Sequence, residues 1–323
     1  MRPQQCSTLF LAELVLAAAL VILLTNTLTE PGRRSHPEGP PQAPVPIEKV
    51  VVIVKEPRTI DDLFGRYRGS RTHYSHKSIP AYTVYAKHFA LAKGMFSSEA
   101  PMNCGDREAA CFNEAFFDEL DSKGVSWRYY VESDQLDNVP RAIKQMRSSR
   151  REGTVLPPSR FLADAQTGDL PQISFVIAPK HYSESLGDDH TSVCVGENWT
   201  VQRLNVLMRS GDWNAMTIFI VWDHVAGLYE HLAPVRADDS ARGPRALLVV
   251  SPWAKRGYVS DTVYQYSSLP AFVERVYSLP AVDGRAALAK DLFEIFQIAG
   301  EPRPPLFLEP RPEVAGAHPP KCV

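Results

Sequence analysis

The stretch TIFIVWDHVAGLYEHLAPV, residues 217–235, decides the fold because it joins a buried strand to a cluster of polar side chains. Its first part, Ile218–Trp222, is an unbroken and largely β-branched apolar run, which is typical of a strand covered on both faces. Ligands of open α/β sheets bind beyond the carboxyl ends of strands, so the polar cluster that follows predicts a functional site. Its members are Asp223, His224, Glu230 and His231. The alternative is a solvated loop whose charges only hydrate the strand end.

Other segments extend this pattern along the chain. A second apolar strand, Val50–Val54, is also followed by a carboxylate, Glu56, and then by one short helical turn at Ile60–Gly65. Further strands are expected at 125–130, 173–178 and 246–250, and helices at 81–96, 116–123, 202–209 and 266–278. Strands that alternate with helices predict a mostly parallel sheet covered on both faces.

Composition is that of a globular protein with an apolar leader. Apolar residues make up 44% and charged residues 22%, and the net charge of −2 gives no field that would attract nucleic acid. Residues 1–25 contain the apolar run Leu14–Leu24, which predicts a signal peptide or an N-terminal membrane anchor. We therefore expect an extracytoplasmic protein, periplasmic or secreted, that is released or stays attached to the membrane through this segment.

The remaining chain divides into three parts by composition. Residues 26–46 form a Pro-rich linker, residues 47–308 the folded domain, and residues 309–323 a loose, Pro-rich tail. Four cysteines lie outside the leader, and an even number suits an exported protein with disulfides. Three pairings are possible; the short loop between Cys104 and Cys111 favours the pairing that joins them, and unpaired thiols are the alternative. The other two cysteines are Cys194 and Cys322.

Four segments in order resemble the bacterial phosphoesterase family that contains phospholipases C and acid phosphatases. They are IEKVVVIVKEPRTIDDLFG (47–65), GVSWRYYVES (124–133), the segment 188–235 that includes GENW and WDHVAGLYEH, and GPRALLVVSPWAKRGYVSDTVYQYSSLPAFVERVYSLP (243–280). The resemblance implies an alkaline-phosphatase-like three-layer α/β/α sandwich with a mostly parallel sheet. It also implies an exported hydrolase that cleaves phosphoric esters, either of phospholipids or of small molecules, with the help of a metal ion.

The same resemblance assigns roles to individual residues. Glu56 and Asp223 match metal-binding carboxylates of the family, and His190 and His231 match histidines near the phosphate. His224 stands where a second acidic ligand is usual, and we expect it to be the third metal ligand. A mixed set of carboxylates and imidazole suits Zn, Mn or Fe better than Ca or Mg, which prefer oxygen ligands.

The chain also departs from the family pattern in ways that bear on activity. Pro57 replaces an asparagine ligand, and a proline side chain cannot coordinate a metal ion. The stretch 97–112 is shorter than the family segment that carries the Ser or Thr nucleophile, and no residue in it can be assigned that role. The alternative function is therefore a catalytically impaired pseudoenzyme that keeps the fold as a membrane-tethered binding module.

Overall fold

The structure is a computed structural model that describes part of the chain. By its internal contacts the chain divides into Met1–Pro44 and Val45–Val323, and every described residue belongs to the second unit. The apolar run of the expected leader lies outside the described residues. Among those that are described, no helix has the length and apolar character needed to cross a membrane. The described residues are 46–55, 58–69, 74–96, 114–132, 153–182, 184, 193–222, 245–265, 267–281, 289–313 and 322.

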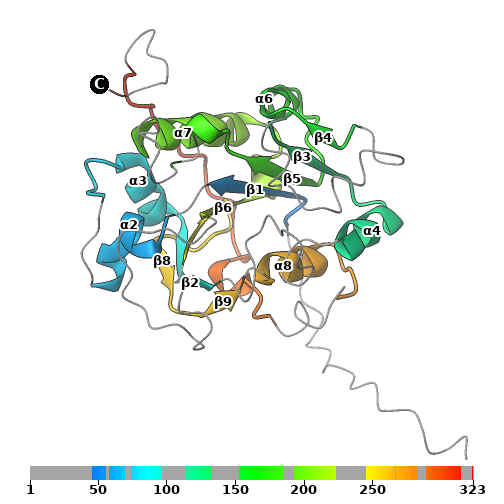
Figure 1. Cartoon of the computed structure of the whole chain (residues 1–323). Helices are drawn as coiled ribbons and strands as arrows, with labels where there is room; N and C mark the ends of the chain where they lie inside the picture. The colour runs from blue at the N-terminus through cyan, green and yellow to red at the C-terminus, as the bar shows by residue number, and fades with distance from the viewer. Residues whose placement is uncertain are drawn as a thin grey trace, which may run out of the picture. The chain divides into compact units, whose positions relative to one another are not determined.

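One sheet with strand order β4-β3-β5-β1-β6-β7-β2-β8 organises the folded unit, with β9 paired to β2 (Figure 1). β1 and β6 lie at its centre and pair in parallel. Within the described part of the chain, β7 alone runs against its neighbours, β6 and β2. The strands are β1 (Lys49–Lys55), β2 (Ala90–Phe96), β3 (Trp127–Tyr130), β4 (Val155–Leu156), β5 (Ile173–Ile177), β6 (Met216–Trp222), β7 (Arg245–Val250), β8 (Tyr258–Ser260) and β9 (Tyr264–Gln265).

Five of the described α-helices overlap the helices and the helical turn expected from the sequence, with different bounds, and the helix at Pro158–Thr167 was not expected. They are α2 (Ile60–Phe64), α3 (Pro80–His88), α4 (Glu114–Ser122), α6 (Pro158–Thr167), α7 (Val193–Arg209) and α8 (Ser268–Val276). Short 3-10 helices occur at η1 (Gly65–Arg68), η3 (Lys180–Tyr182), η4 (Trp213–Ala215) and η7 (Phe293–Ile295). A capping box fixes the start of α2. The Thr59 side chain accepts a hydrogen bond from the backbone N–H of Asp62, and the Asp62 carboxylate accepts one from the backbone N–H of Thr59.

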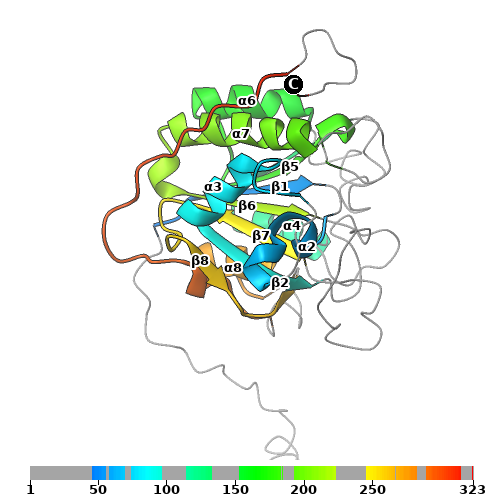
Figure 2. The same cartoon turned by 90° about the vertical axis from the view of Figure 1, so that its left-hand side faces the viewer.

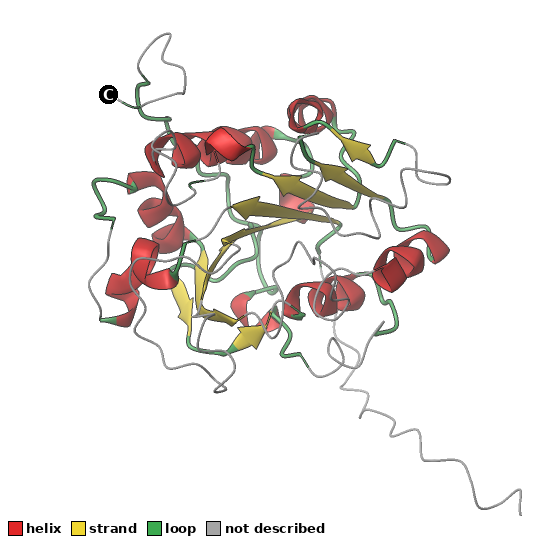
Figure 3. Ribbon diagram, viewed as in Figure 1, coloured by secondary structure: helices red, strands yellow, loops and turns green. Residues whose placement is uncertain are grey.

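Helices cover both faces of the sheet (Figure 3). On one face, Phe219 of β6 packs against Phe272 of α8, with ring centroids 5.1 Å apart. On the other face, Trp222 of the same strand packs edge-on against Tyr82 of α3 at 5.3 Å. Figure 2 shows α6 and α7 lying side by side over this second face. The expected α/β sandwich with a mostly parallel sheet is confirmed.

The helix expected over residues 81–96 is wrong in its second half. α3 ends at His88, and Ala90–Phe96 forms β2, which pairs with β7 on one side and with β8 and β9 on the other. Alanine and leucine favour helices in isolation, but here Ala90, Leu91 and Ala92 are fully buried between neighbouring strands. Burial by tertiary packing outweighs the weak local preference.

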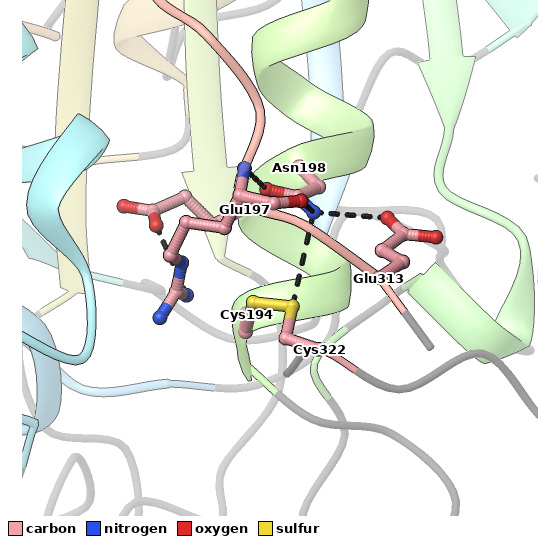
Figure 4. Close-up of a disulfide and its surroundings, with 6 residues drawn as sticks. Cys194, Glu197, Asn198, Glu313 and Cys322 are labelled. Carbon is pink, nitrogen blue, oxygen red and sulfur yellow. Dashed lines mark hydrogen bonds and ion pairs between the residues drawn. A yellow bond between two sulfur atoms is a disulfide. The ribbon is translucent and has the colours of Figure 1, made fainter. Parts of the chain in front are cut away.

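Residues 306–311 of the C-terminal segment lie against α7 (Figure 2). Of the tail expected to be loose, 309–323, the structure describes residues 309–313 and 322. Two asparagines of α7, seven residues apart, bind the backbone of the C-terminal segment. The Asn198 side chain donates to the Arg311 carbonyl and accepts from the Arg311 N–H. The Asn205 side chain does the same with the carbonyl and N–H of Leu308. A disulfide joins Cys194 of α7 to Cys322 (Figure 4). This bridge belongs to the expected pairing, whose other members, Cys104 and Cys111, lie outside the described residues.

Candidate active site

The carboxyl ends of β1 and β6 lie side by side at the centre of the sheet. Lys55, the last residue of β1, is the register partner of Trp222, the last residue of β6. Neighbouring strands are about 4.8 Å apart, so the chain leaves the sheet at two closely spaced points. Glu56 directly follows the first end and Asp223 the second. The two predicted carboxylate ligands thus follow neighbouring strand ends.

All five predicted site residues lie outside the described residues. They are the predicted metal ligands Glu56, Asp223 and His224 and the predicted catalytic residues His190 and His231. Within the described ranges, no group of three or more His, Cys, Asp or Glu side chains could hold a metal ion. The assignments of these five residues therefore stay predictions.

The last residue of β1, Lys55, has a buried side chain. The Lys55 Nζ donates to the backbone carbonyls of Tyr182, at 2.5 Å, and Gly196, at 2.9 Å, and lies 3.1 Å from the Glu184 carboxylate. Burial lowers the pKa of Lys55, and the Glu184 carboxylate opposes that shift. Because three acceptors match the three N–H donors of an ammonium group, we assign Lys55 as charged.

Glu184 connects the two strand ends to each other. Its Oε1 accepts from the Tyr82 hydroxyl at 2.6 Å and faces Lys55, while its Oε2 accepts from the indole N–H of Trp222 at 2.8 Å. The Glu184 side chain is fully buried, as is that of Lys55. A single carboxylate thereby contacts the last residue of β1, the last residue of β6 and helix α3.

The first turns of α7 are shaped to receive this carboxylate. A Cβ atom added at Gly196 would lie 2.2 Å from the Glu184 Cγ and 2.6 Å from its Oε1. A glycine is therefore required for the close approach, since no other residue leaves that space empty. Thr200 reinforces the arrangement, because its hydroxyl donates to the Gly196 carbonyl at 3.0 Å and lies 3.0 Å from the Tyr82 hydroxyl.

A second buried carboxylate, Glu197, lies next to the first. It accepts from the backbone N–H of Tyr82 at 2.8 Å and from the Arg311 guanidinium at 3.2 Å. Figure 4 shows Glu197 beside the disulfide at the start of α7. Burial raises the pKa of Glu197 to about 8, although Arg311 favours the charged form. Burial and the neighbouring Glu184 carboxylate likewise raise the pKa of the Tyr82 hydroxyl.

Sequence reasoning missed this buried network. Lys55 carried a detectable signal, because a lysine at the end of an otherwise apolar strand needs an anionic partner if it is buried. Glu184 carried none, since it lies in the polar stretch HYSESLGDDH, where any of several side chains could have been the partner. The N-terminal half of α7 also escaped detection, because Gly196 and β-branched residues lower its helix propensity.

The donor types at the two strand ends fit a divalent cation. The predicted ligands Glu56, Asp223 and His224 would supply two carboxylates and one imidazole, a ligand set that Zn, Mn and Fe accept. Lys55 and Trp222, which precede Glu56 and Asp223 in the sequence, are paired on adjacent strands. Glu184 also balances the charge of Lys55, which would otherwise repel a cation held by the next residue.

This chain belongs to the Phosphoesterase family. The family pattern matches residues 105–280, more than half of the 323-residue chain. The match spans α4, β3, β5, α7, β6, β7 and α8, which form much of the sheet and both helical layers. The resemblance seen in the sequence is thereby confirmed.

Curated relatives are phospholipases C of bacteria and plants. The non-hemolytic phospholipase C of Pseudomonas aeruginosa is 27% identical over 237 residues, which cover 58% of this chain and 34% of that protein. The non-specific phospholipase C1 of Arabidopsis thaliana is 26% identical over 225 residues, which cover 59% of this chain and 41% of that protein. The chain thus spans about a third to two-fifths of the length of these relatives.

A solved structure with a related arrangement comes from Vibrio parahaemolyticus and is described as a protein in the alkaline phosphatase superfamily. It superposes with a TM-score of 0.48 at 10% identity, over 76% of this chain and 73% of that one.

Proposed function

We propose that this chain is a metal-dependent hydrolase of phosphoric esters. The observation that supports the proposal is the register of Lys55 with Trp222, because these two residues directly precede Glu56 and Asp223 in the sequence. Membership of the Phosphoesterase family supports the same reaction class. The similarity to phospholipases C makes a phospholipid a candidate substrate beside small phosphoesters.

In this proposal Glu56, Asp223 and His224 hold a Zn, Mn or Fe ion. A divalent cation at such a site supplies positive charge against the oxygens of the phosphoryl group. His190 and His231 hydrogen-bond the phosphoryl group or donate a proton to the leaving oxygen, roles for which the imidazole pKa is suited. The buried network around Glu184 contacts the last residue of each of the two strands, Lys55 and Trp222.

The test compares two aspartate variants of the purified full chain. Asp223→Asn should lower kcat/KM toward a chromogenic aryl phosphodiester or phosphomonoester by at least about 100-fold, because a neutral amide replaces an anionic metal ligand. The control, Asp169→Asn, removes an exposed carboxylate near the amino end of β5 and should change kcat/KM by no more than about twofold. Assays contain added Zn, Mn or Fe(II), and an Asp223→Asn enzyme as active as wild type would refute the assigned role.

The alternative function is a binding module that has lost catalysis. Pro57 and the shortened stretch 97–112 favour it, because the family carries a metal ligand and a nucleophile there. Removing groups that act as a unit should lower turnover by orders of magnitude. Calorimetric titration with the same metals separates the two functions: sub-millimolar binding supports the hydrolase, whereas no binding together with no turnover supports the module.

We further propose that the folded unit acts outside the cytoplasm. The apolar run at residues 14–24 supports export, and the Cys194–Cys322 disulfide suits an oxidising compartment. Fusing a reporter that is active only after export behind residue 47 should give activity in a bacterial host. An inactive fusion, next to an active cytoplasmic reporter fused at the same position, would contradict export and any membrane attachment through this segment.

A further inference from the structure

Glu184 contacts the residue that precedes each of the two predicted carboxylate ligands. Its Oε1 lies 3.1 Å from the Nζ of Lys55, and its Oε2 accepts the indole N–H of Trp222 at 2.8 Å. Lys55 and Trp222 are register partners at the ends of β1 and β6. The carboxylate therefore adds a side-chain bridge beside the last described backbone pair of the two strands.

The conformation of Glu184 is fixed from several directions. The residue has a backbone φ of 70°, which lies in the left-handed region that few residues other than glycine adopt. Gly196 leaves space for its side chain, as a Cβ there would overlap with Cγ. Tyr82 holds Oε1 through its hydroxyl, at 2.6 Å. Strain of this kind persists only where the surrounding structure over-determines the conformation, and it is concentrated at functional sites.

We propose that Glu184 is a positioning residue, which sets the separation and direction of the segments carrying Glu56 and Asp223; this role rests on the proposed function. Two physical effects support the role. The bridge limits the freedom of the two strand ends, and partners that orient metal ligands typically contribute a factor of about 10–100 in metal affinity or activity. Its negative charge also balances Lys55, so that the lysine does not oppose a cation at the neighbouring position.

The test replaces the buried ion pair by apolar side chains. In Lys55→Met/Glu184→Leu no charge is left buried and unpaired, and such replacements often preserve or raise stability. The double variant should remain folded by circular dichroism and thermal unfolding. Without the bridge, its dissociation constant for Zn or Mn should rise by about 10–100-fold, and kcat should fall more than KM rises.

A matched control alters another buried carboxylate on the same side of the sheet. Asp164 of α6 is 1% exposed and pairs with Arg128 of β3 at 2.8 Å. Its carboxylate also accepts from Tyr130 of β3 and Arg160 of α6, so these contacts lie on β3 and α6. Arg128→Met/Asp164→Leu replaces an ion pair in the same way and should also remain folded. Its metal dissociation constant should nevertheless stay within about twofold of wild type, since distant sites act independently.

A second variant keeps every charge and displaces only Glu184. Gly196→Ala places a Cβ 2.2 Å from the Glu184 Cγ, whereas a Cβ at Gly211 has no atom within 4 Å. We expect weaker metal binding and lower kcat for Gly196→Ala and wild-type values for Gly211→Ala. Wild-type metal affinity and kcat in folded Lys55→Met/Glu184→Leu or Gly196→Ala would overturn the positioning role while leaving the proposed function in place. A wild-type chain that binds no divalent ion would overturn both.

Discussion

A buried carboxyl group with a raised pKa makes the stability of this protein depend on pH. Burial raises the pKa of Glu197 to about 8, from a value near 4.5 in the unfolded chain. The folded state therefore binds this proton more tightly than the unfolded state does. The stabilisation is fully present below about pH 4.5 and is lost as the pH rises to about 8, since the unfolded chain releases the proton first.

Glu197→Gln should remove this pH dependence because the amide stays neutral. Because the Glu197 carboxyl has a pKa of about 8 in the folded state, the free energy of unfolding of wild type should decline by about a few kcal/mol between pH 5 and 8. Urea unfolding across that range measures the slope. The control, Glu301→Gln, changes an exposed carboxyl group and should keep the wild-type slope. Parallel curves for wild type and Glu197→Gln would show that Glu197 titrates normally.

Single residues also show where sequence reasoning stops. Asn198 fits a glycosylation sequon, yet it is 1% exposed and both ends of its side-chain amide bind the backbone of Arg311. Its role is therefore to hold the C-terminal segment. Glu184 is a similar case, because its function depends on the unusual backbone of one residue and on space left by Gly196. Neither property can be inferred from residue type or spacing.

At the scale of elements, the central strands were the most predictable part. β1 and β6 are unbroken apolar runs, and such runs are buried on both faces wherever they lie in a parallel sheet. Their carboxyl ends were predicted to carry the site, and the register of Lys55 with Trp222 brings those ends together. The five candidate residues themselves stay predictions, because they lie outside the described residues.

Elements with mixed signals were predicted poorly. The sequence 81–96 contains a helix and a strand, α3 and β2, and the apolar spacing of the helix runs on into the strand without a break. Phe89, the C-cap of α3, is followed at once by residues that pair with β7 and β8. The pairing of β2 with β7 depends on partners 150 or more residues away, and local periodicity contains no information about them.

At the scale of the whole folded unit, the C-terminal segment acts as a strap over several elements. Arg303 donates to the backbone carbonyls of His88, Ser251 and Ala254, while its own carbonyl accepts from the indole N–H of Trp213. Further along, Arg311 reaches Glu197. The proline-rich composition from residue 309 suggested a loose tail, because proline has no backbone N–H to donate in a helix or a sheet. Extended chain can still be fixed when asparagines on a helix bind its backbone.

The disulfide completes this strap, and removing it should destabilise the folded unit. Cys194 and Cys322 are 128 residues apart in sequence, so their bond restricts a large part of the unfolded chain. Cys194→Ala/Cys322→Ser should lower the free energy of unfolding by about 2–4 kcal/mol, a fall in melting temperature on the order of 5–10 °C. Replacing both residues avoids a free thiol that could form other bridges. Thermal unfolding with and without reductant is the measurement.

Reductant should lower the melting temperature of wild type toward that of the double variant. Any further effect of reductant on the variant would report on a bridge between Cys104 and Cys111, the other pair of the expected arrangement. If the variant instead has the melting temperature of oxidised wild type, the hydrogen bonds from Asn198 and Asn205 would be sufficient to hold the segment. In that case, the disulfide would contribute nothing measurable to the stability of the folded unit, contrary to the loss expected from the length of chain that it closes.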